Sequence, residues 1–443
     1  MKQILNILNT MRRLQESIYT PDRDNTDILE LYKSVLEIVN DKQGYIQKSE
    51  CMVNSLTENC LSEELEKQWL NYAGSIFASY MAVKLYEDDS KGETPFSPQE
   101  LEQILEFYQQ GNFLPEVVSM GTYSCAQQLK CEDPMRCYEL TKTAFSINPN
   151  LAGILGITYR FEGSDTNESL TKECPFCGTS GRELIPYYCA PQVLKLKNNS
   201  AFPPAKLWMK CNHCGNYFTY NFPKKSIGIN NGHYTKERAA DTLQNKFRLE
   251  NYNLIFNTFK KLTSGKEYLE IGIGTGEMLA VALEFGYHVE AVEICREDCE
   301  RVSQALGIDI QWGDITEYES EKQYDVIVMG DVLEHVIYPV KVLEKVKRML
   351  ADDGILWIST PNYNCAYARM QKFSHCMWHE VNHYTYVSYE TLKNLLENMQ
   401  LNIVHYDMSS RYIGSMELFI RHNHLNGIES QRDRRHMCID TEN

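Results

Sequence analysis

The chain reads Glu270-Ile271-Gly272-Ile273-Gly274-Thr275-Gly276 immediately after an apolar pair at 268–269 and immediately before a run of helical periodicity at 277–285. This order predicts a strand, a glycine turn and a helix in succession. The three glycines bare the backbone, so a nucleoside-bearing ligand can lie against the turn. A dinucleotide fingerprint would have its third glycine where this chain has Glu277, so the spacing disfavours a dinucleotide as the ligand.

Further apolar segments of strand length follow the turn. They lie at 288–293, 309–312, 324–329, 354–359 and 416–420, with an amphipathic helix expected at 339–350. The first of them ends in Glu293, about twenty residues past the turn, which is the reach needed to contact ribose hydroxyls. We therefore expect Glu293 to be the ribose ligand.

These motifs resemble, in their order, those of class I S-adenosylmethionine-dependent methyltransferases, over roughly Leu249 to His422. The resemblance implies a doubly wound, seven-stranded Rossmann-like α/β sheet into which the strand at 416–420 is inserted antiparallel. It also implies that an acid after the third strand binds the adenine amino group. The cofactor-binding residues that the resemblance implies are Glu270, Gly272, Gly274, Gly276, Glu293, Asp314 and Asp331. The alternative is a nucleotide-binding or dehydrogenase domain of the same architecture.

Histidines in two segments are candidates for the group that takes a proton from the methyl acceptor, because their side chains titrate near neutrality. The family pattern implies two histidines after the fifth strand: His383 fits the second, and the first position corresponds to either His379 or Glu380. Our first candidate for the base is His383 and our second is His379. His335, after the fourth strand, is the third. The alternative for His335 is to cap or orient a helix near the cofactor, and for Asp331 it is to cap the following segment.

Upstream, the chain contains two Cys-x-x-Cys knuckles separated by residues 178–210. Four thiolates predict a tetrahedral zinc site, and it would be structural because no position stays open for substrate. The ligands would be Cys174, Cys177, Cys211 and Cys214. The alternative for the set is unligated thiols. His213 lies between two of the cysteines, and we expect it to be a bystander rather than a fifth ligand. A zinc ribbon ahead of a methyltransferase core resembles bacterial sugar and small-molecule methyltransferases, which implies a small-molecule or sugar acceptor.

The N-terminal third has apolar residues at helical spacing, with helices expected at 27–39, 63–86, 97–108 and 134–145. A docking or dimerisation domain is the first interpretation, and a peptide-binding solenoid, which would give the protein a protein partner, is the second. The expected domains are an all-α part at 1–160, a zinc ribbon at 170–234, a methyltransferase domain at 235–424 and a disordered tail at 425–443.

Composition limits the remaining classes. The net charge of −16 disfavours nonspecific nucleic-acid binding, although the segment 205–262 has an excess of Lys and Arg interleaved with aromatics. Three interpretations of that segment stay open: it binds RNA, it binds a nucleotide-sugar diphosphate, or it is simply a solvated helix face. Fifteen cysteines without an export signal or an apolar membrane segment lead us to expect reduced thiols in the cytoplasm. Two rival functions stay open: a protein or RNA methyltransferase that recruits its substrate through the helical or basic segment, and a non-catalytic binding module.

Overall fold

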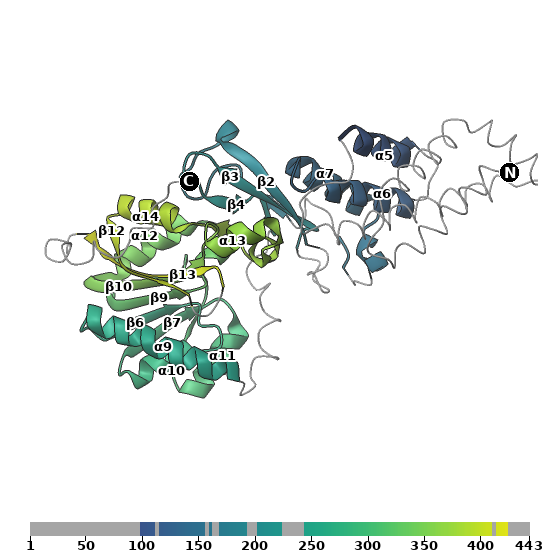
Figure 1. The fold of residues 1–443 in the computed structure, drawn as a ribbon. Coiled ribbons are helices and arrows are strands. Elements are labelled where there is room, and N and C mark those ends of the chain that lie inside the picture. Colours follow the sequence, from purple (N-terminus) through teal and green to yellow (C-terminus); the bar gives the residue numbers. More distant parts are fainter. Residues whose placement is uncertain are drawn as a thin grey trace, which may run out of the picture.

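The computed structural model describes residues 98–110, 115–155, 159–161, 168–192, 202–223, 243–409 and 413–423. The helices expected at 27–39 and 63–86 and the tail expected at 425–443 lie outside these ranges. Within them, a group of helices is followed by small β-sheets and then by a large sheet with helices on both faces (Figure 1).

The large sheet has seven strands in the order β12-β13-β10-β9-β6-β7-β8. From β8 to β10 all neighbours are parallel, while β13 runs antiparallel between β10 and β12. This topology confirms the predicted Rossmann-like sheet and its antiparallel insertion. The strands are β6 (Glu267–Ile271), β7 (His288–Glu293), β8 (Gln311–Trp312), β9 (Tyr324–Gly330), β10 (Leu350–Pro361), β12 (Leu401–Met408) and β13 (Ser415–His422).

The central strand β9 shows why the sheet is covered on both sides. Val326 and Val328 belong to one buried cluster, whereas Ile327 and Met329 belong to another. Successive strand residues point to opposite faces, so an unbroken apolar strand needs helices on both. One face packs on α9 (Leu243–Leu262) and α10 (Glu277–Glu284), and the other on α12 (Pro339–Met349) and α14 (Tyr389–Asn398). Figure 1 shows α11 (Arg296–Leu306) beside α10.

The ribbon sheet contains β2 (Leu184–Pro191), β3 (Ala205–Cys211) and β4 (Tyr217–Thr219). Its fourth strand is β11 (Thr385–Tyr386), which comes after β10 in the chain and pairs antiparallel with β4. Beside it, β1 (Glu168–Leu170) pairs with β5 (Asn221–Pro223). The expected boundary between ribbon and methyltransferase segments is therefore crossed by one shared sheet.

The helical part that the structure describes consists of α5 (Pro98–Gln110), α6 (Pro115–Gln128) and α7 (Pro134–Ile147). The first and third agree with the helices expected at 97–108 and 134–145, and α6 was not expected. Tyr138 of α7 shares a buried cluster with Leu207 and Met209 of β3, so the helices continue the core of the ribbon. Among the helices described, none is long and apolar enough to cross a bilayer.

Candidate functional site

The three glycines of the turn after β6 all have left-handed backbones, with φ of 77° at Gly272, 52° at Gly274 and 87° at Gly276. A Cβ on Gly272 would lie 2.7 Å from Val332 Cγ2, and one on Gly276 would lie 2.7 Å from Val302 Cγ1. A Cβ on Gly274 would meet nothing within 4 Å. Two glycines therefore allow close packing, while the middle one faces open space that a ligand can occupy.

Glu293, the last residue of β7, connects the turn to its own strand end. Its Oε2 accepts a hydrogen bond from the Ile273 amide (2.9 Å) and its Oε1 accepts one from the Cys295 amide (2.7 Å). The side chain is buried, and this burial raises the pKa of Glu293. The carboxylate thus lies directly beside the glycine turn, as the sequence predicted.

The other predicted cofactor acids lie at neighbouring strand ends. Glu270, near the end of β6, is buried and accepts a hydrogen bond from the Tyr268 hydroxyl (2.8 Å). Asp314 follows β8, and its Oδ1 accepts bonds from the amide and the hydroxyl of Thr316, both at 2.8 Å. Because the carboxyl ends of parallel strands meet at one edge, Glu270, Glu293 and Asp314 lie along the same edge of the sheet as the glycine turn.

A cleft of about 280 Å³ opens near the carboxyl end of β9. It is lined by Asp331, Glu334, His335, Pro361, His375, Cys376, Met377, Glu380, His383, Ile413, Gly414 and Ser415. Val332, which touches the turn at Gly272, directly follows Asp331 in the chain. The glycine turn and the cleft are therefore adjacent.

Asp331 has a left-handed backbone, with φ of 56°, which is unusual for a residue other than glycine. Its amide donates to the Ser359 carbonyl (2.9 Å), and its Oδ1 accepts from the Ser359 hydroxyl (2.8 Å). The short helix η4 (Leu333–His335) that follows has no side-chain cap. Asp331 thus contributes to the cleft wall, and strain of this kind is concentrated at functional sites.

The structure brings two of the three candidate histidines together. The rings of His335 and His383 lie edge to face, with centroids 4.5 Å apart. Desolvation by burial lowers the pKa of His335. His379, by contrast, is not among the cleft-lining residues: its Nε2 donates to the Phe373 carbonyl (2.8 Å), and its ring packs edge-on against Tyr188.

Lys206 of β3 contacts the loop that lines the cleft, which its place in the basic segment of the sequence did not indicate. Its side chain is buried, at 3% exposure, and Nζ donates to the carbonyls of Glu380 (2.5 Å), Val381 (2.7 Å) and His383 (2.7 Å). A ribbon strand therefore holds the loop that carries His383. No pattern of charge spacing distinguishes such a buried lysine from a solvated one.

His375 was also missed. Its Nδ1 accepts a hydrogen bond from the Met377 amide (3.2 Å), so in the neutral ring the proton is on Nε2. Within the described part of the chain, this buried Nε2 has no hydrogen-bond partner. His375 lines the cleft, so a buried N–H without a partner among the described residues lies at the cleft wall.

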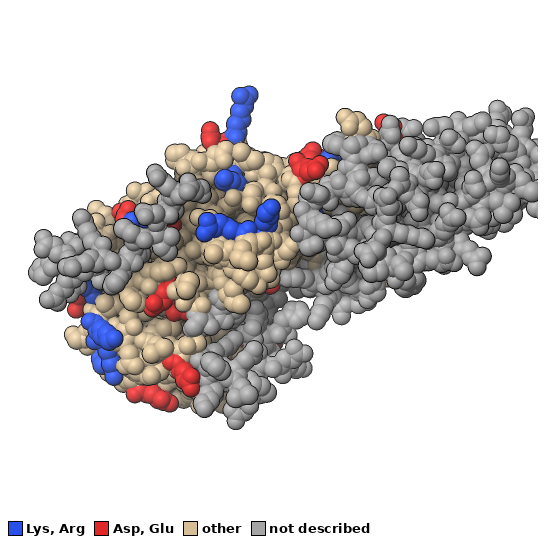
Figure 2. Space-filling view, in the orientation of Figure 1, with Lys and Arg blue, Asp and Glu red and all other residues tan. Residues whose placement is uncertain are grey.

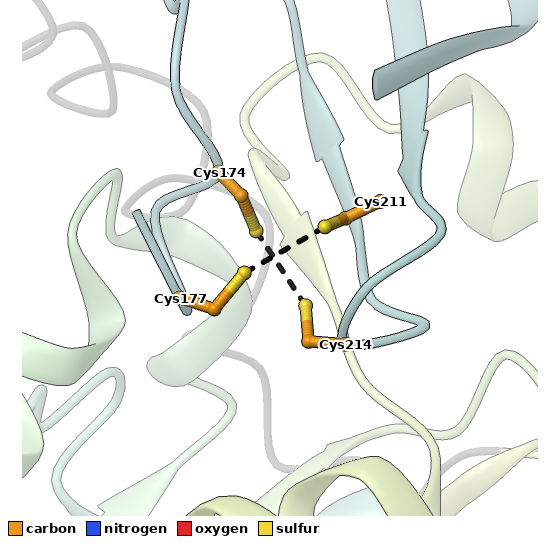
Figure 3. Close-up of side chains that lie close together, drawn as sticks. All are labelled: Cys174, Cys177, Cys211 and Cys214. Carbon is orange, nitrogen blue, oxygen red and sulfur yellow. Dashed lines mark hydrogen bonds between the residues drawn. The ribbon is translucent and has the colours of Figure 1, made fainter. Parts of the chain in front are cut away.

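The four predicted zinc ligands converge from two turns (Figure 3). The Cys174 and Cys214 sulfurs are 3.6 Å apart, and so are the Cys177 and Cys211 sulfurs. Zinc–sulfur bonds of about 2.3 Å in a tetrahedron place sulfurs roughly 3.8 Å apart, so the four thiols fit zinc. Gly178 and Gly215 after the two knuckles have φ of 71° and 76°, as these tight turns require.

Three of the described aromatics in the basic segment are not available to nucleic-acid bases. Trp208, Tyr217 and Phe218 are all buried, and Lys206 is buried with them. On the face shown in Figure 2, Lys and Arg side chains stand in small separate groups with acidic groups among them. The described residues of this segment therefore do not form the exposed stacking surface that single-stranded RNA uses.

Comparison with known proteins gives the class of the large-sheet region. Residues 238–406 match the sequence model of a family described as "Methyltransferase domain". Together with the strand order, this match shows that the chain contains a class I S-adenosylmethionine-dependent methyltransferase domain.

Particular relatives resemble only parts of the chain. The ubiquinone biosynthesis O-methyltransferase of Aeromonas salmonicida is 30% identical over 107 residues, which are 23% of this chain and 45% of that protein. An uncharacterized methyltransferase of Staphylococcus carnosus is 26% identical over 34% of this chain and 78% of its own length. Among solved structures, the N-methyltransferase NodS of Bradyrhizobium japonicum with S-adenosyl-L-homocysteine has 18% identity and a TM-score of 0.34, covering 45% of this chain and 97% of that one. The chain thus spans about half the length of the first of these curated relatives.

Proposed function

We propose that this protein transfers a methyl group from S-adenosylmethionine to a small-molecule or sugar acceptor. The observation that carries the proposal is the continuity of the glycine turn with the cleft, through the contact between Gly272 and Val332. A methyl donor held at the turn would lie next to an acceptor held in the cleft. Alignment of the two is the main task of the protein, because the donor already carries its leaving group.

The cofactor would be held by residues at the ends of β6, β7 and β8. Gly274 offers open space above the backbone, Glu293 offers carboxylate oxygens for the ribose hydroxyls, and Asp314 offers one for the adenine amino group. Bound S-adenosylmethionine supplies a methyl group on a positively charged sulfur. These hydrogen-bond acceptors fit a nucleoside with two vicinal hydroxyls and an exocyclic amine.

The acceptor would occupy the cleft, whose volume of about 280 Å³ is near the lower end of small-molecule sites. His383 and His335 are the groups that activate its nucleophile in this proposal, and His375 donates to one of its oxygens. His379 supports the loop instead, through its bond to Phe373. The small-molecule names of the matched relatives, such as ubiquinone biosynthesis O-methyltransferase, support this acceptor class.

The four-cysteine site would hold a structural zinc ion that stabilises the ribbon. Because its four ligands are all protein thiolates, the ion would leave no position for the acceptor. Within the described ranges, no cysteine forms a disulfide. Free thiols support a reducing compartment such as the cytoplasm.

Incubating the protein with methyl-labelled S-adenosylmethionine and a fractionated cell extract tests the proposal. We expect one small metabolite to gain the label and a methyl mass, and we expect no transfer with the Gly274→Leu variant. Label that enters only the protein or RNA fraction would overturn the assignment of the acceptor. No transfer to any fraction would overturn the proposed activity.

A further inference from the structure

Glu334, His335 and His383 form a cluster of potential metal ligands apart from the cysteine site. One ligand atom from each lies within 4.8 Å of those of the other two. Glu334 and His335 belong to η4 after β9, whereas His383 comes from the loop before β11. All three line the cleft.

Hydrogen bonds set the tautomers of both imidazoles. The Tyr386 hydroxyl donates to the Met377 carbonyl, so it accepts from His383 Nδ1, 2.7 Å away. The Asn382 carbonyl can only accept, so His335 Nδ1, 3.0 Å away, carries a proton as well. In their neutral forms both rings therefore carry a lone pair on Nε2. Fixing Nδ1–H to a carbonyl or hydroxyl is how proteins prepare histidine as a metal ligand.

The carboxylate of the cluster is oriented in the same manner. Glu334 is 2% exposed, and its Oε2 accepts a hydrogen bond from the Thr360 hydroxyl (3.0 Å). Burying a carboxylate beside two imidazoles is costly unless positive charge compensates it. A divalent cation at this point would add that charge.

We propose that Glu334, His335 and His383 bind a divalent transition-metal cation in the cleft. Two imidazole nitrogens and one carboxylate suit Mn²⁺, Fe²⁺, Co²⁺ or Zn²⁺ better than Mg²⁺ or Ca²⁺, which prefer oxygen ligands alone. Ligands at about 2.1 Å from a metal are up to roughly 4.2 Å apart, so the cluster needs little movement to close on an ion. Three protein ligands leave positions open toward the cleft.

This inference rests on the proposed function and specifies how the acceptor is activated. An acceptor hydroxyl bound to the cation loses its proton to water more readily. Its oxygen then forms the new bond to the methyl carbon, while the carbon–sulfur bond breaks and its electron pair stays on sulfur. His383 acts here as a ligand, so chelation of the cation stops transfer, whereas a base acting directly would not need the cation.

Mn²⁺ titration of the full chain, followed by electron paramagnetic resonance, tests the site. The protein is first loaded with one zinc per chain, because the four thiolates prefer zinc to Mn²⁺. We expect one Mn²⁺ to bind per chain without any acceptor. His383→Asn and Glu334→Gln should abolish this binding, and His375→Asn, a cleft histidine outside the cluster, should leave it unchanged.

Tyr386→Phe gives a second, milder variant, because its ring can stay stacked on Trp208 while the partner of His383 Nδ1 is lost. We expect it to weaken Mn²⁺ binding by about 10- to 100-fold. Absence of Mn²⁺ binding, or equal binding by wild type and His383→Asn, would overturn the cation site. S-Adenosylhomocysteine binding is measured on the same samples to separate the two proposals. If S-adenosylhomocysteine binds and Mn²⁺ does not, the cation site alone is rejected. If S-adenosylhomocysteine does not bind, the proposed function is rejected.

Discussion

Gly274 and Gly286 both have left-handed backbones and open space where a side chain would stand, but only Gly274 lies in the turn after β6. A leucine should therefore strain both positions similarly, by about 1–2 kcal/mol. Gly274→Leu should also fill the space assigned to the cofactor and weaken S-adenosylhomocysteine binding by roughly 100-fold or more, or about 3 kcal/mol. Calorimetry on the two variants checks this prediction, and equal binding by both would remove the turn from the cofactor site.

Glu293 and Glu290 allow a similar comparison within β7. Glu293 is buried against the turn, whereas Glu290 is half-exposed and pairs with Lys322 (2.6 Å). Hydrogen bonds to a charged group contribute about 1.5–3 kcal/mol each, so Glu293→Ala should weaken S-adenosylhomocysteine binding by at least about tenfold. Glu290→Ala should bind like the wild type in the same titration. A Glu293→Ala protein with wild-type affinity would show that this carboxylate is no ligand.

Between the elements, Lys206 couples β3 to the loop at 380–383 through three hydrogen bonds. Lys206→Met should remove the hydrogen bonds to three carbonyls of this loop and move His383. It should leave the proposed cofactor-binding residues around the glycine turn unchanged. A misplacement of about 1 Å can cost roughly 100-fold in turnover, so methyl transfer should fall on that scale with unaltered S-adenosylhomocysteine affinity. Lys210→Met, on the same strand but partly exposed, is the control.

Hydrogen exchange gives the readout that distinguishes positioning from general support. In Lys206→Met, the amides of residues 380–384 should exchange faster while those of β6 and β9 keep their protection. If exchange in the loop matches the wild type, Lys206 does not position it.

The sequence predicted the elements whose signals are local. The strand end at Glu293 and the start of α12 at Pro339 lie where apolar runs and turn residues put them, and β9 ends at Gly330, one residue beyond the predicted end. It did not predict β12, α6 or the two-residue strand β11, whose pairing with β4 depends on tertiary contacts. The meeting of His335 with His383, and the burial of Lys206, depend on that pairing, so spacing along the chain could not reveal them.

For the whole molecule, we expect the ribbon to stabilise the helical part and the methyltransferase domain as well as itself. The reason is that β11 joins the ribbon sheet and that buried residues of α7, β3 and α12 share one core. Removing the proposed zinc, through Cys174→Ser with Cys214→Ser, should therefore lower Tm by about 10 °C or more, since each 1 kcal/mol shifts Tm by roughly 2–4 °C at this domain size. Thermal unfolding and metal analysis check this together. A mutant that keeps its Tm while losing its zinc would show that the metal does not support the fold.

We propose that the methyl donor binds beside the glycine turn, next to an acceptor cleft. Calorimetric titration of the purified, folded chain with S-adenosylmethionine and with S-adenosylhomocysteine tests it most directly. We expect one site per chain for either molecule, lost in Gly274→Leu and kept in Gly286→Leu. No heat of binding from either molecule on folded, zinc-loaded protein would contradict it.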